Sequence, residues 1–301
     1  MFRLGLAAAL AASACGRFGF DPGNTRDDAM VVSTDSSIDA PPPDALPPMG
    51  PFGTAMPVPG LNTAASEDDP SLTGDQLEIV FNSDRAGGVG AGDMWTASRP
   101  SLTSGWTGVT NLSTLNTAGD DATPALSRDG LTLLWTAAGS KGMKDIFMAT
   151  RPSRTAAWSA AQELTAISTT GDDAGPFLSA DGLELYFASD APGNDNLYVA
   201  RRTTTTAAFT TAAQITELNT TSPDHEPWVN GTKSFLVWTS TRVSGNDDLW
   251  MARRADASAT WGTAAPITEL NTASTESDPW LSPDETTIYF ARGTDIFMAS
   301  R

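Results

Sequence analysis

The chain has 301 residues, with 36 acidic and 18 basic side chains and a formal net charge of −18 at pH 7. This acidic surplus excludes nucleic acid as a partner, because contacts to phosphates require clustered Lys and Arg. The single cysteine, Cys15, excludes an internal disulfide and a zinc site made of cysteines. The sequence has no nucleophile elbow, phosphate loop or zinc-binding His pair, so we expect no cofactor and no metal ion.

Residues 1–15 have the pattern of an export signal. A short basic start precedes an apolar run over residues 4–12 that is too short to span a bilayer. Small residues then lead to Cys15 in a pattern that resembles a bacterial lipobox, where the cysteine becomes the lipidated first residue. Gly16 and Arg17 lack the Asp that marks inner-membrane retention in enteric bacteria. We therefore expect an exported outer-membrane lipoprotein that contacts the membrane only through a lipid on Cys15, with ordinary secretion as the alternative.

Residues 16–50 have the composition of a tether. They are rich in Asp, Ser, Pro and Thr and contain few large apolar residues, so they cannot bury enough surface to fold alone. Pro41–Pro43 and Pro47–Pro48 favour the extended polyproline conformation. We expect this segment to be disordered and to hold a folded domain, residues 51–301, away from the membrane.

The folded domain repeats one pattern with a period of 51 to 54 residues, and a proline marks each copy. The prolines are Pro70, Pro124, Pro176, Pro227 and Pro279. A period of this size indicates a propeller or a solenoid. Nine residues after each proline begins a run of three large apolar residues, such as Ile79–Phe81. Such a run is typical of a strand buried on both faces, as in a blade packed between two others.

Other positions of the repeat define four antiparallel strands in each copy. Asp-Gly or Asn-Gly pairs, such as Asp181-Gly182, supply the turn between the first two strands. A third strand begins at an Asp or Asn and ends near an arginine, and an aromatic residue follows seven positions later. A fourth strand contains one large apolar residue. The arginines are Arg99, Arg151, Arg202, Arg254 and Arg301, and the apolar residues of the fourth strand are Leu112, Leu164, Ile215 and Ile267.

The fifth copy ends at Arg301, before its fourth strand. The missing quarter stands at the other end of the domain, where Phe52 and Val58 keep the spacing of the other copies. We therefore predict an all-β fold, a five-bladed β-propeller of four-stranded antiparallel blades, in which residues 52–63 supply the outermost strand of the last blade. This closure removes the free sheet edges that would invite aggregation.

Two stretches of the repeat have a characteristic sequence. The turn Pro176–Gly182 reads Pro-Phe-Leu-Ser-Ala-Asp-Gly, and the strand Asp248–Arg254 reads Asp-Leu-Trp-Met-Ala-Arg-Arg. With the Ser-x-Arg loops at Ser83–Arg85 and Ser240–Arg242, they resemble the TolB-like (WD-like) β-propeller repeat of bacterial envelope proteins. The resemblance covers residues 52–301. It implies an envelope location and a role in protein interaction.

An acidic residue stands three positions before each proline. These residues are Glu67, Asp121, Asp173, Asp224 and Glu276. An acid present in every copy can cap a turn by accepting backbone N–H bonds. The same residues could instead form an acidic rim around the mouth of the central channel, facing a cation or a basic partner. The sequence leaves both interpretations open.

A second set of residues differs between copies and is therefore the candidate ligand-binding site. It consists of His225, Glu226, Trp228, Asp278 and Trp280, which fall on adjacent blades. Tryptophan beside carboxylates suits the stacking of a sugar face and hydrogen bonding to its hydroxyls. The two tryptophans could also be packing residues between blades.

These features favour a non-enzymatic binding scaffold of the cell envelope, monomeric, with an envelope protein or a glycan as its partner. The alternative is a carbohydrate-active enzyme, since glycoside hydrolysis requires two carboxylates in different environments. Asp69, Glu226 and Asp278 are the acids that stand directly before a proline in only some copies, so they are the catalytic candidates of this alternative.

Overall fold

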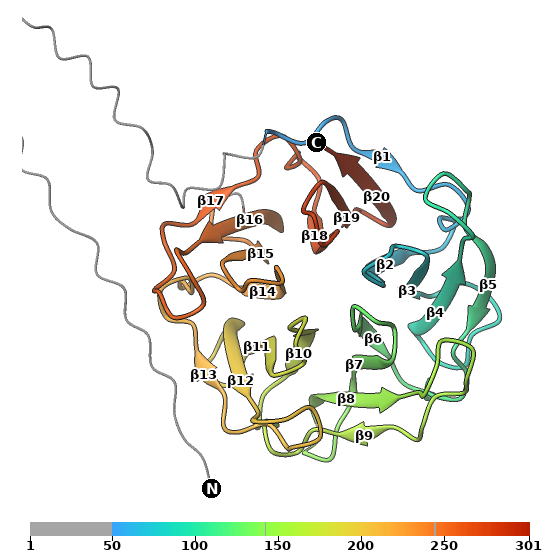
Figure 1. Cartoon of the computed structure of the whole chain (residues 1–301), viewed down its shortest axis with the longest axis horizontal. Helices are drawn as coiled ribbons and strands as arrows, with labels where there is room; N and C mark the ends of the chain where they lie inside the picture. The colour runs from blue at the N-terminus through green and yellow to red at the C-terminus, as the bar shows by residue number, and fades with distance from the viewer. Residues whose placement is uncertain (1–49, 142, 244) are drawn as a thin grey trace, which may run out of the picture. The chain divides into compact units, whose positions relative to one another are not determined.

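The computed structural model describes residues 50–301, except residues 142 and 244. These residues form twenty strands in five four-stranded antiparallel sheets, arranged around a central axis (Figure 1). The predicted five-bladed β-propeller is therefore confirmed. No helix in the described part of the chain is long and apolar enough to cross a membrane. The expected export signal, Cys15 and most of the expected tether lie outside the described residues.

From the axis outwards, blade one contains β2 (Glu67–Leu72), β3 (Glu78–Ser83), β4 (Asp93–Ser98) and β5 (Thr107–Asn111). Blade two contains β6 (Ala122–Leu126), β7 (Thr132–Ala138), β8 (Lys144–Thr150) and β9 (Gln162–Glu163). Blade three contains β10 (Asp173–Leu178), β11 (Glu184–Ser189), β12 (Asn196–Arg201) and β13 (Ala213–Gln214). Blade four contains β14 (Asp224–Val229), β15 (Phe235–Ser240), β16 (Asp248–Arg253) and β17 (Ala265–Pro266). Blade five contains β18 (Glu276–Leu281), β19 (Thr287–Arg292), β20 (Asp295–Ser300) and, from the start of the domain, β1 (Met56–Pro57).

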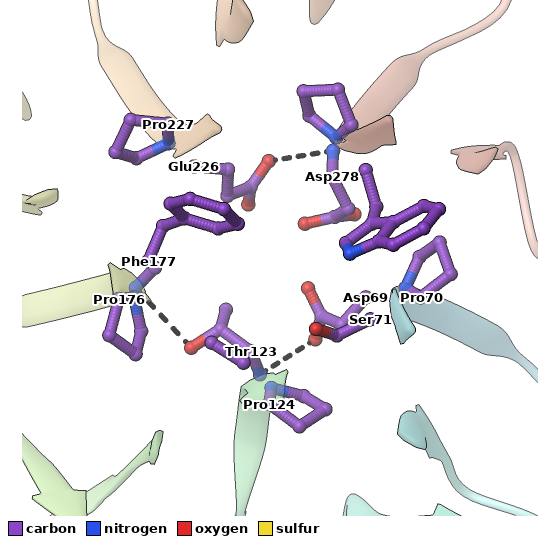
Figure 2. A pocket seen from close by; sticks show the side chains of 14 residues that line it. Asp69, Pro70, Ser71, Thr123, Pro124, Pro176, Phe177, Glu226, Pro227 and Asp278 are labelled. Atoms are coloured by element: carbon purple, nitrogen blue, oxygen red, sulfur yellow. Dashed lines mark hydrogen bonds between the residues drawn. The ribbon is translucent and has the colours of Figure 1, made fainter. Parts of the chain in front are cut away.

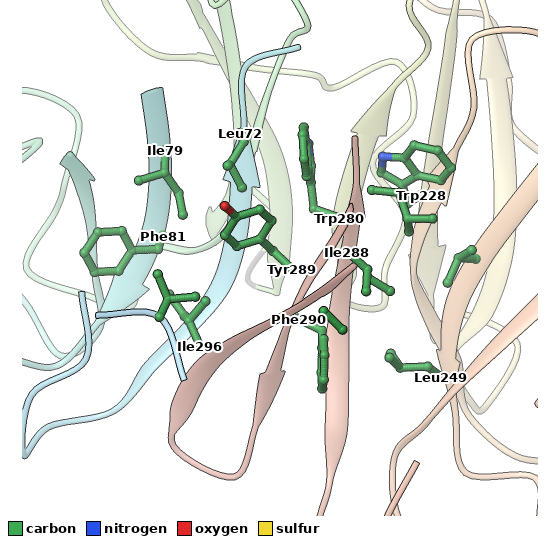
Figure 3. Packing of buried hydrophobic residues seen from close by; sticks show 14 of the residues in the cluster. Leu72, Ile79, Phe81, Trp228, Leu249, Trp280, Ile288, Tyr289, Phe290 and Ile296 are labelled. Carbon is green, nitrogen blue, oxygen red and sulfur yellow. The ribbon is translucent and has the colours of Figure 1, made fainter. Parts of the chain in front are cut away.

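The hydrophobic core lies between neighbouring blades. The second strand of each blade is buried on both faces, and Ile79, Val80 and Phe81 of β3 are each at most 1% exposed. Figure 3 shows the interface between blades one and five, where Leu72 and Phe81 belong to the same cluster as Tyr289 of β19. Two packed faces explain why the apolar runs are continuous rather than alternating.

The ring is closed by the start of the domain, as the sequence predicts. Strand β1 pairs antiparallel with β20, with Met56 opposite Met298. Beyond the strand, Val58 N–H donates to the Ile296 carbonyl at 2.9 Å. The Asn62 side chain then caps Ile296, accepting its N–H at 3.0 Å and donating to its carbonyl at 2.9 Å. These bonds join sequence positions more than 230 residues apart, so both ends of the domain hold one blade.

The repeated arginine fastens each blade at its outer edge. The Arg99 guanidinium lies 4.3 Å from the Trp106 ring centroid, and its Nε donates to the Gln76 carbonyl at 2.8 Å. In the closing blade, Arg301 makes the same contact with Phe52 at 4.2 Å. The arginine thus ties an outer segment to the hairpin turn between the two inner strands. The other three pairs are Arg151 with Trp158, Arg202 with Phe209, and Arg254 with Trp261.

The fourth strands are shorter than expected. The apolar residues assigned to them from the sequence, such as Ile215, follow the strand and begin the next turn. Ile215 N–H donates to the Leu197 carbonyl at 2.8 Å, and the Ile215 carbonyl accepts from Leu218 N–H at 3.1 Å. The side chain is 5% exposed. The apolar residue therefore anchors the turn to the core instead of extending the strand.

Candidate functional site

The innermost strand of every blade contains the same irregularity, directly before the repeated proline. In β2 the register with β3 shifts between Asp68 and Ser71. The residue at this bulge has a positive φ in all five blades: Asp69 (53°), Thr123 (46°), Gly175 (60°), Glu226 (52°) and Asp278 (55°). Residues other than glycine rarely adopt this conformation, and it occurs more often at functional sites. The bulges turn these five positions towards the channel axis.

Three of these side chains are carboxylates that converge at one end of the channel (Figure 2). One oxygen from each of Asp69, Glu226 and Asp278 lies within 4.8 Å of the others. They line a cavity of about 40 Å³ together with Thr123 and Phe177. We call this end, where the innermost strands begin, the upper mouth. Its volume is room for roughly three water molecules.

Glu226 is the carboxylate with the most hydrogen bonds in this group. One oxygen lies 3.1 Å from His225 Nδ1, and the other accepts from Thr239 Oγ1 at 2.8 Å and from Asp278 N–H at 3.1 Å. Burial alone would raise the pKa of Glu226, but the charge of His225 and these hydrogen bonds outweigh it and lower the pKa to about 2. Glu226 is therefore ionised at neutral pH.

His225 is the cationic partner of Glu226. Its Nε2 also lies 3.2 Å from an Asp247 oxygen. Burial alone would lower the pKa of His225, but the charge of Glu226 and the hydrogen bonds that the imidazole donates to Asp247 and Glu226 raise it well above its usual value. A protonated His225 neutralises Glu226 and leaves the other two carboxylates without a positive neighbour in hydrogen-bond contact.

Asp69 and Asp278 have weaker partners. Asp69 accepts the Thr123 N–H at 2.8 Å, and Asp278 accepts from Ser277 Oγ at 2.7 Å. Among the residues that the structure describes, no Lys or Arg forms an ion pair with either. Burial, and then the negative charge of a neighbouring carboxylate, raise the pKa of both well above the usual value. Both aspartates therefore keep a proton to higher pH than an ordinary aspartate does.

The acidic character extends to Asp68, beside Asp69. Burial, followed by the charges of Asp69 and Glu226, raises the pKa of Asp68 to about 8. One oxygen of Asp68 and one of Asp278 are buried without a hydrogen-bond partner. Such oxygens are costly to bury. Asp69, Glu226 and Asp278 could jointly hold a compact cation, which would offset the repulsion between their charges.

The five acids that stand three residues before the prolines do not form an exposed rim. Each is 0% exposed. Each accepts the N–H of the threonine four residues earlier, as Asp121 does from Thr117 at 2.5 Å and Glu276 from Thr272 at 2.7 Å. The expectation of an acidic rim is thus corrected, and the capping interpretation holds. The five residues are Glu67, Asp121, Asp173, Asp224 and Glu276.

The two tryptophans of the candidate ligand site are buried between blades. Trp228 is 3% exposed and packs edge-on against Phe235, and Trp280 is 5% exposed and packs edge-on against Tyr289. Their ring faces are not open for stacking a sugar. The structure thus brings His225 together with Glu226 and Asp278, whereas the tryptophans belong to the core.

Comparisons with known proteins give similarity in fold only. No family model and no curated protein matches the sequence. A family 117 glycoside hydrolase from Zobellia galactanivorans has a TM-score of 0.58 at 14% identity, covering 83% of this chain and 90% of that one. A thermostable family-43 glycoside hydrolase has a TM-score of 0.57 at 11% identity, covering 81% and 91%. A TolB candidate from Agrobacterium tumefaciens has a TM-score of 0.51 at 13% identity, covering 79% and 76%.

Proposed function

We propose that the chain is an exported, non-enzymatic binding scaffold of the cell envelope, and that its upper mouth receives a compact cation. The observation that carries the proposal is the convergence of Asp69, Glu226 and Asp278 within 4.8 Å. Within residues 50–301 as the structure describes them, only Glu226 of the three has a cationic partner in contact, His225. The cation could be the ammonium group of a lysine on a partner protein or a divalent metal ion, since both suit closely spaced carboxylate oxygens.

The backbone supports a role in binding rather than in folding. Asp69, Glu226 and Asp278 pair a positive φ with closely spaced, partly buried carboxylates, and both features reduce stability. Two further blades use Thr123 and Gly175 at the equivalent position, so the propeller folds without an acid there. These carboxylates reduce stability, and the repeat does not require them. Both properties are expected of residues that are retained because they bind a ligand.

A carbohydrate-active enzyme is the second candidate. The same three carboxylates favour it, because they meet at the end of a channel. The two catalytic carboxyl groups of glycosidases lie roughly 5–5.5 Å apart in retaining enzymes and 6.5–9.5 Å apart in inverting ones. A cavity of about 40 Å³ has no room for a sugar ring. The size of the cavity favours the binding scaffold over the enzyme.

Terbium luminescence tests the cation site directly. Trp280 lines the upper mouth and would sensitise Tb³⁺ held by the carboxylates. We expect Asp69→Asn and Asp278→Asn to weaken Tb³⁺ binding at least tenfold. Glu217→Gln is the matched control, because it removes one charge from an exposed residue outside the cluster. Equal binding by all four proteins would exclude the site.

Two competition arms identify the physiological cation. Ca²⁺ that displaces Tb³⁺ at micromolar concentration supports a metal ion, whereas displacement by a lysine-containing peptide but not by its acetyl-lysine form supports a protein partner. A panel of aryl glycosides tests the enzyme in parallel. If the wild-type protein hydrolyses a glycoside and both Asp69→Asn and Asp278→Asn abolish this activity, the glycosidase function is supported and the non-enzymatic scaffold is refuted.

The envelope location rests on the sequence of residues 1–15 and is tested separately. We expect the mature protein to begin at Cys15 with a lipid, and Cys15→Ser to release it from the membrane fraction. Mass spectrometry of the N-terminal peptide measures the first outcome, and immunoblotting of the membrane and soluble fractions measures the second. A mature N-terminus without lipid would support ordinary secretion instead.

A further inference from the structure

The opposite end of the channel is apolar. We call it the lower mouth, and it lies where the innermost strands end. A second cavity of about 40 Å³ opens there. Phe177 and Trp280 line both this cavity and the upper one, so these two aromatic residues separate the two ends of the channel. The wall of the lower cavity includes one aliphatic residue from each blade: Leu72, Leu126, Leu178, Val229 and Leu281.

One residue breaks the repeat at the lower mouth. The position four residues after each proline lines this cavity, and it is occupied by Gly74, Arg128, Ala180, Gly231 and Pro283. Four blades therefore present a small or cyclic apolar residue, and blade two presents a long cationic one. A purely structural position would not need a guanidinium in a single blade.

The neighbouring glycines make room for the Arg128 side chain. A Cβ atom on Gly74 would collide with Arg128 Cγ, and a Cβ atom on Gly231 would lie 3.5 Å from Arg128 Nη1. The side chain therefore passes over blade one and reaches blade four at the edge of the cavity. A side chain larger than hydrogen at position 74 would displace it.

The Arg128 guanidinium is free to bind a ligand. In the described part of the chain, the guanidinium forms no hydrogen bond and no ion pair. The backbone carbonyl of Arg128 accepts a hydrogen bond from Gly74 N–H at 2.8 Å. Other cations on this face are already paired, as Arg154 is with Asp75 at 2.6 Å and Lys233 is with Asp181 at 2.7 Å. Arg128 is an exposed residue, and its unpaired guanidinium lies beside an apolar cavity in a protein of net charge −18.

We propose that the lower mouth binds a small carboxylate with a short apolar tail. The Arg128 guanidinium matches the two oxygens of a carboxylate. The tail enters between the aliphatic residues and ends against Phe177 and Trp280. The cavity volume is room for roughly three water molecules, which corresponds to a tail of about three carbons. This site is distinct from the cation site and selects the opposite charge.

A series of carboxylates measured by calorimetry and ligand-observed NMR tests the site. We expect butyrate to bind roughly tenfold more tightly than acetate, because two more methylene groups are buried. Octanoate should bind no more tightly than butyrate, since the cavity is then full. Butanamide, which has the same tail without the charge, should bind at least fivefold more weakly. Equal binding of butyrate and butanamide by the wild-type protein would overturn the proposal.

Variants assign the preference to Arg128. Arg128→Gln should abolish the difference between butyrate and butanamide, and Gly74→Ala should reduce it by displacing the guanidinium. Arg201→Gln is the matched control, because Arg201 is an exposed arginine on β12 whose partner is Glu184. A preference retained in Arg128→Gln would refute the site. If this variant does not fold, the wild-type comparison of the two ligands decides.

A peptide arm distinguishes the source of the carboxylate. A peptide that ends in a free valine and its amidated form are titrated in the same way. Binding of the free form alone points to the C-terminus of a protein, and binding of butyrate but of neither peptide points to a free short-chain acid. Failure of every ligand in this series overturns the lower site and leaves the terbium experiment on the upper mouth unaffected.

Discussion

Two sets of carboxylates lie within three residues of each other in the inner strands. They differ in how many blades contain them, in exposure and in hydrogen-bond partners. The set three residues before the prolines occurs in all five blades, is 0% exposed, and is held by turn N–H groups. The set directly before the prolines occurs in three blades and meets on the axis. The first set holds the turns of the blade, and the second is the candidate cation site proposed above. In this repeat protein, recurrence marks structure and departure from recurrence marks a candidate site.

Electrostatic partners follow the same division. Asp224 accepts hydrogen bonds from Trp238 Nε1 at 3.0 Å and from the Arg242 guanidinium, so its charge is compensated. Asp278 faces Glu226 and Asp69, so its charge is opposed. Removing one partner of a compensated buried pair is strongly destabilising because it leaves the other charge unpaired. Opposed charges with perturbed pKa values cluster at functional sites.

The largest effect is expected from removing a compensated carboxylate. Asp224→Ala leaves the Arg242 guanidinium buried without its partner and should cost about 3–5 kcal/mol of unfolding free energy. Asp173→Ala is the matched control, because Asp173 caps the equivalent turn of blade three through Thr169 and has no arginine partner among the described residues. This variant should lose about 1–3 kcal/mol of unfolding free energy. Urea denaturation measures both. Equal losses would mean that the turn, and not the ion pair, carries the stability.

The fold could be predicted because its signals are local and repeated five times. The run Ile79–Phe81, the turn Asp181-Gly182 and the spacing of Phe52 each identify an element without knowledge of its neighbours. The propeller and its closure follow from these elements alone.

The site could be predicted only in part. A residue before proline is normally extended, so the positive φ of Asp69 was not expected, and Gly175 gave the only sequence hint of it. The burial of Trp228 and Trp280 depends on an adjacent blade, which no single copy of the repeat describes. Arg128 was missed because its importance depends on glycines in blades one and four.

A smaller effect with the opposite sign is expected on the axis. Asp278→Asn should stabilise the cation-free protein by about 1 kcal/mol at pH 8, since asparagine resembles the protonated acid and tolerates a positive φ. The folded-state pKa of Asp278 is raised, so protonation of this group favours the folded state. Its contribution to stability is fully present below the unfolded pKa of 3.8 and is lost as the pH rises through the folded pKa.

The gain from Asp278→Asn should therefore be close to zero at pH 4 and should grow towards pH 8. Urea denaturation in the presence of a chelator, at pH 4, 6 and 8, measures this trend. Glu217→Gln is again the control and should show no such trend. Destabilisation by Asp278→Asn at every pH would place Asp278 in the structural set instead.

The smallest effect is expected at a partly exposed ion pair that joins blades three and four. Lys233 Nζ lies 2.7 Å from Asp181, whose side chain is 46% exposed. Burial opposes ionisation of Asp181, but the hydrogen bonds from Lys233 and Ser179 together outweigh it and lower the pKa to about 2. Because the pair is screened by solvent, Lys233→Gln should cost at most about 1 kcal/mol at pH 7.

The pH dependence of this last effect has the reverse sign. A lowered carboxylate pKa contributes stability that is present above the unfolded value of 3.8 and disappears as the pH falls through about 2. The melting temperatures of wild type and Lys233→Gln should therefore converge at low pH, and also in about 1 M salt, where surface charges are screened. A difference that persists in both conditions would show that Lys233 joins the two blades through packing of its aliphatic stem and not through its charge.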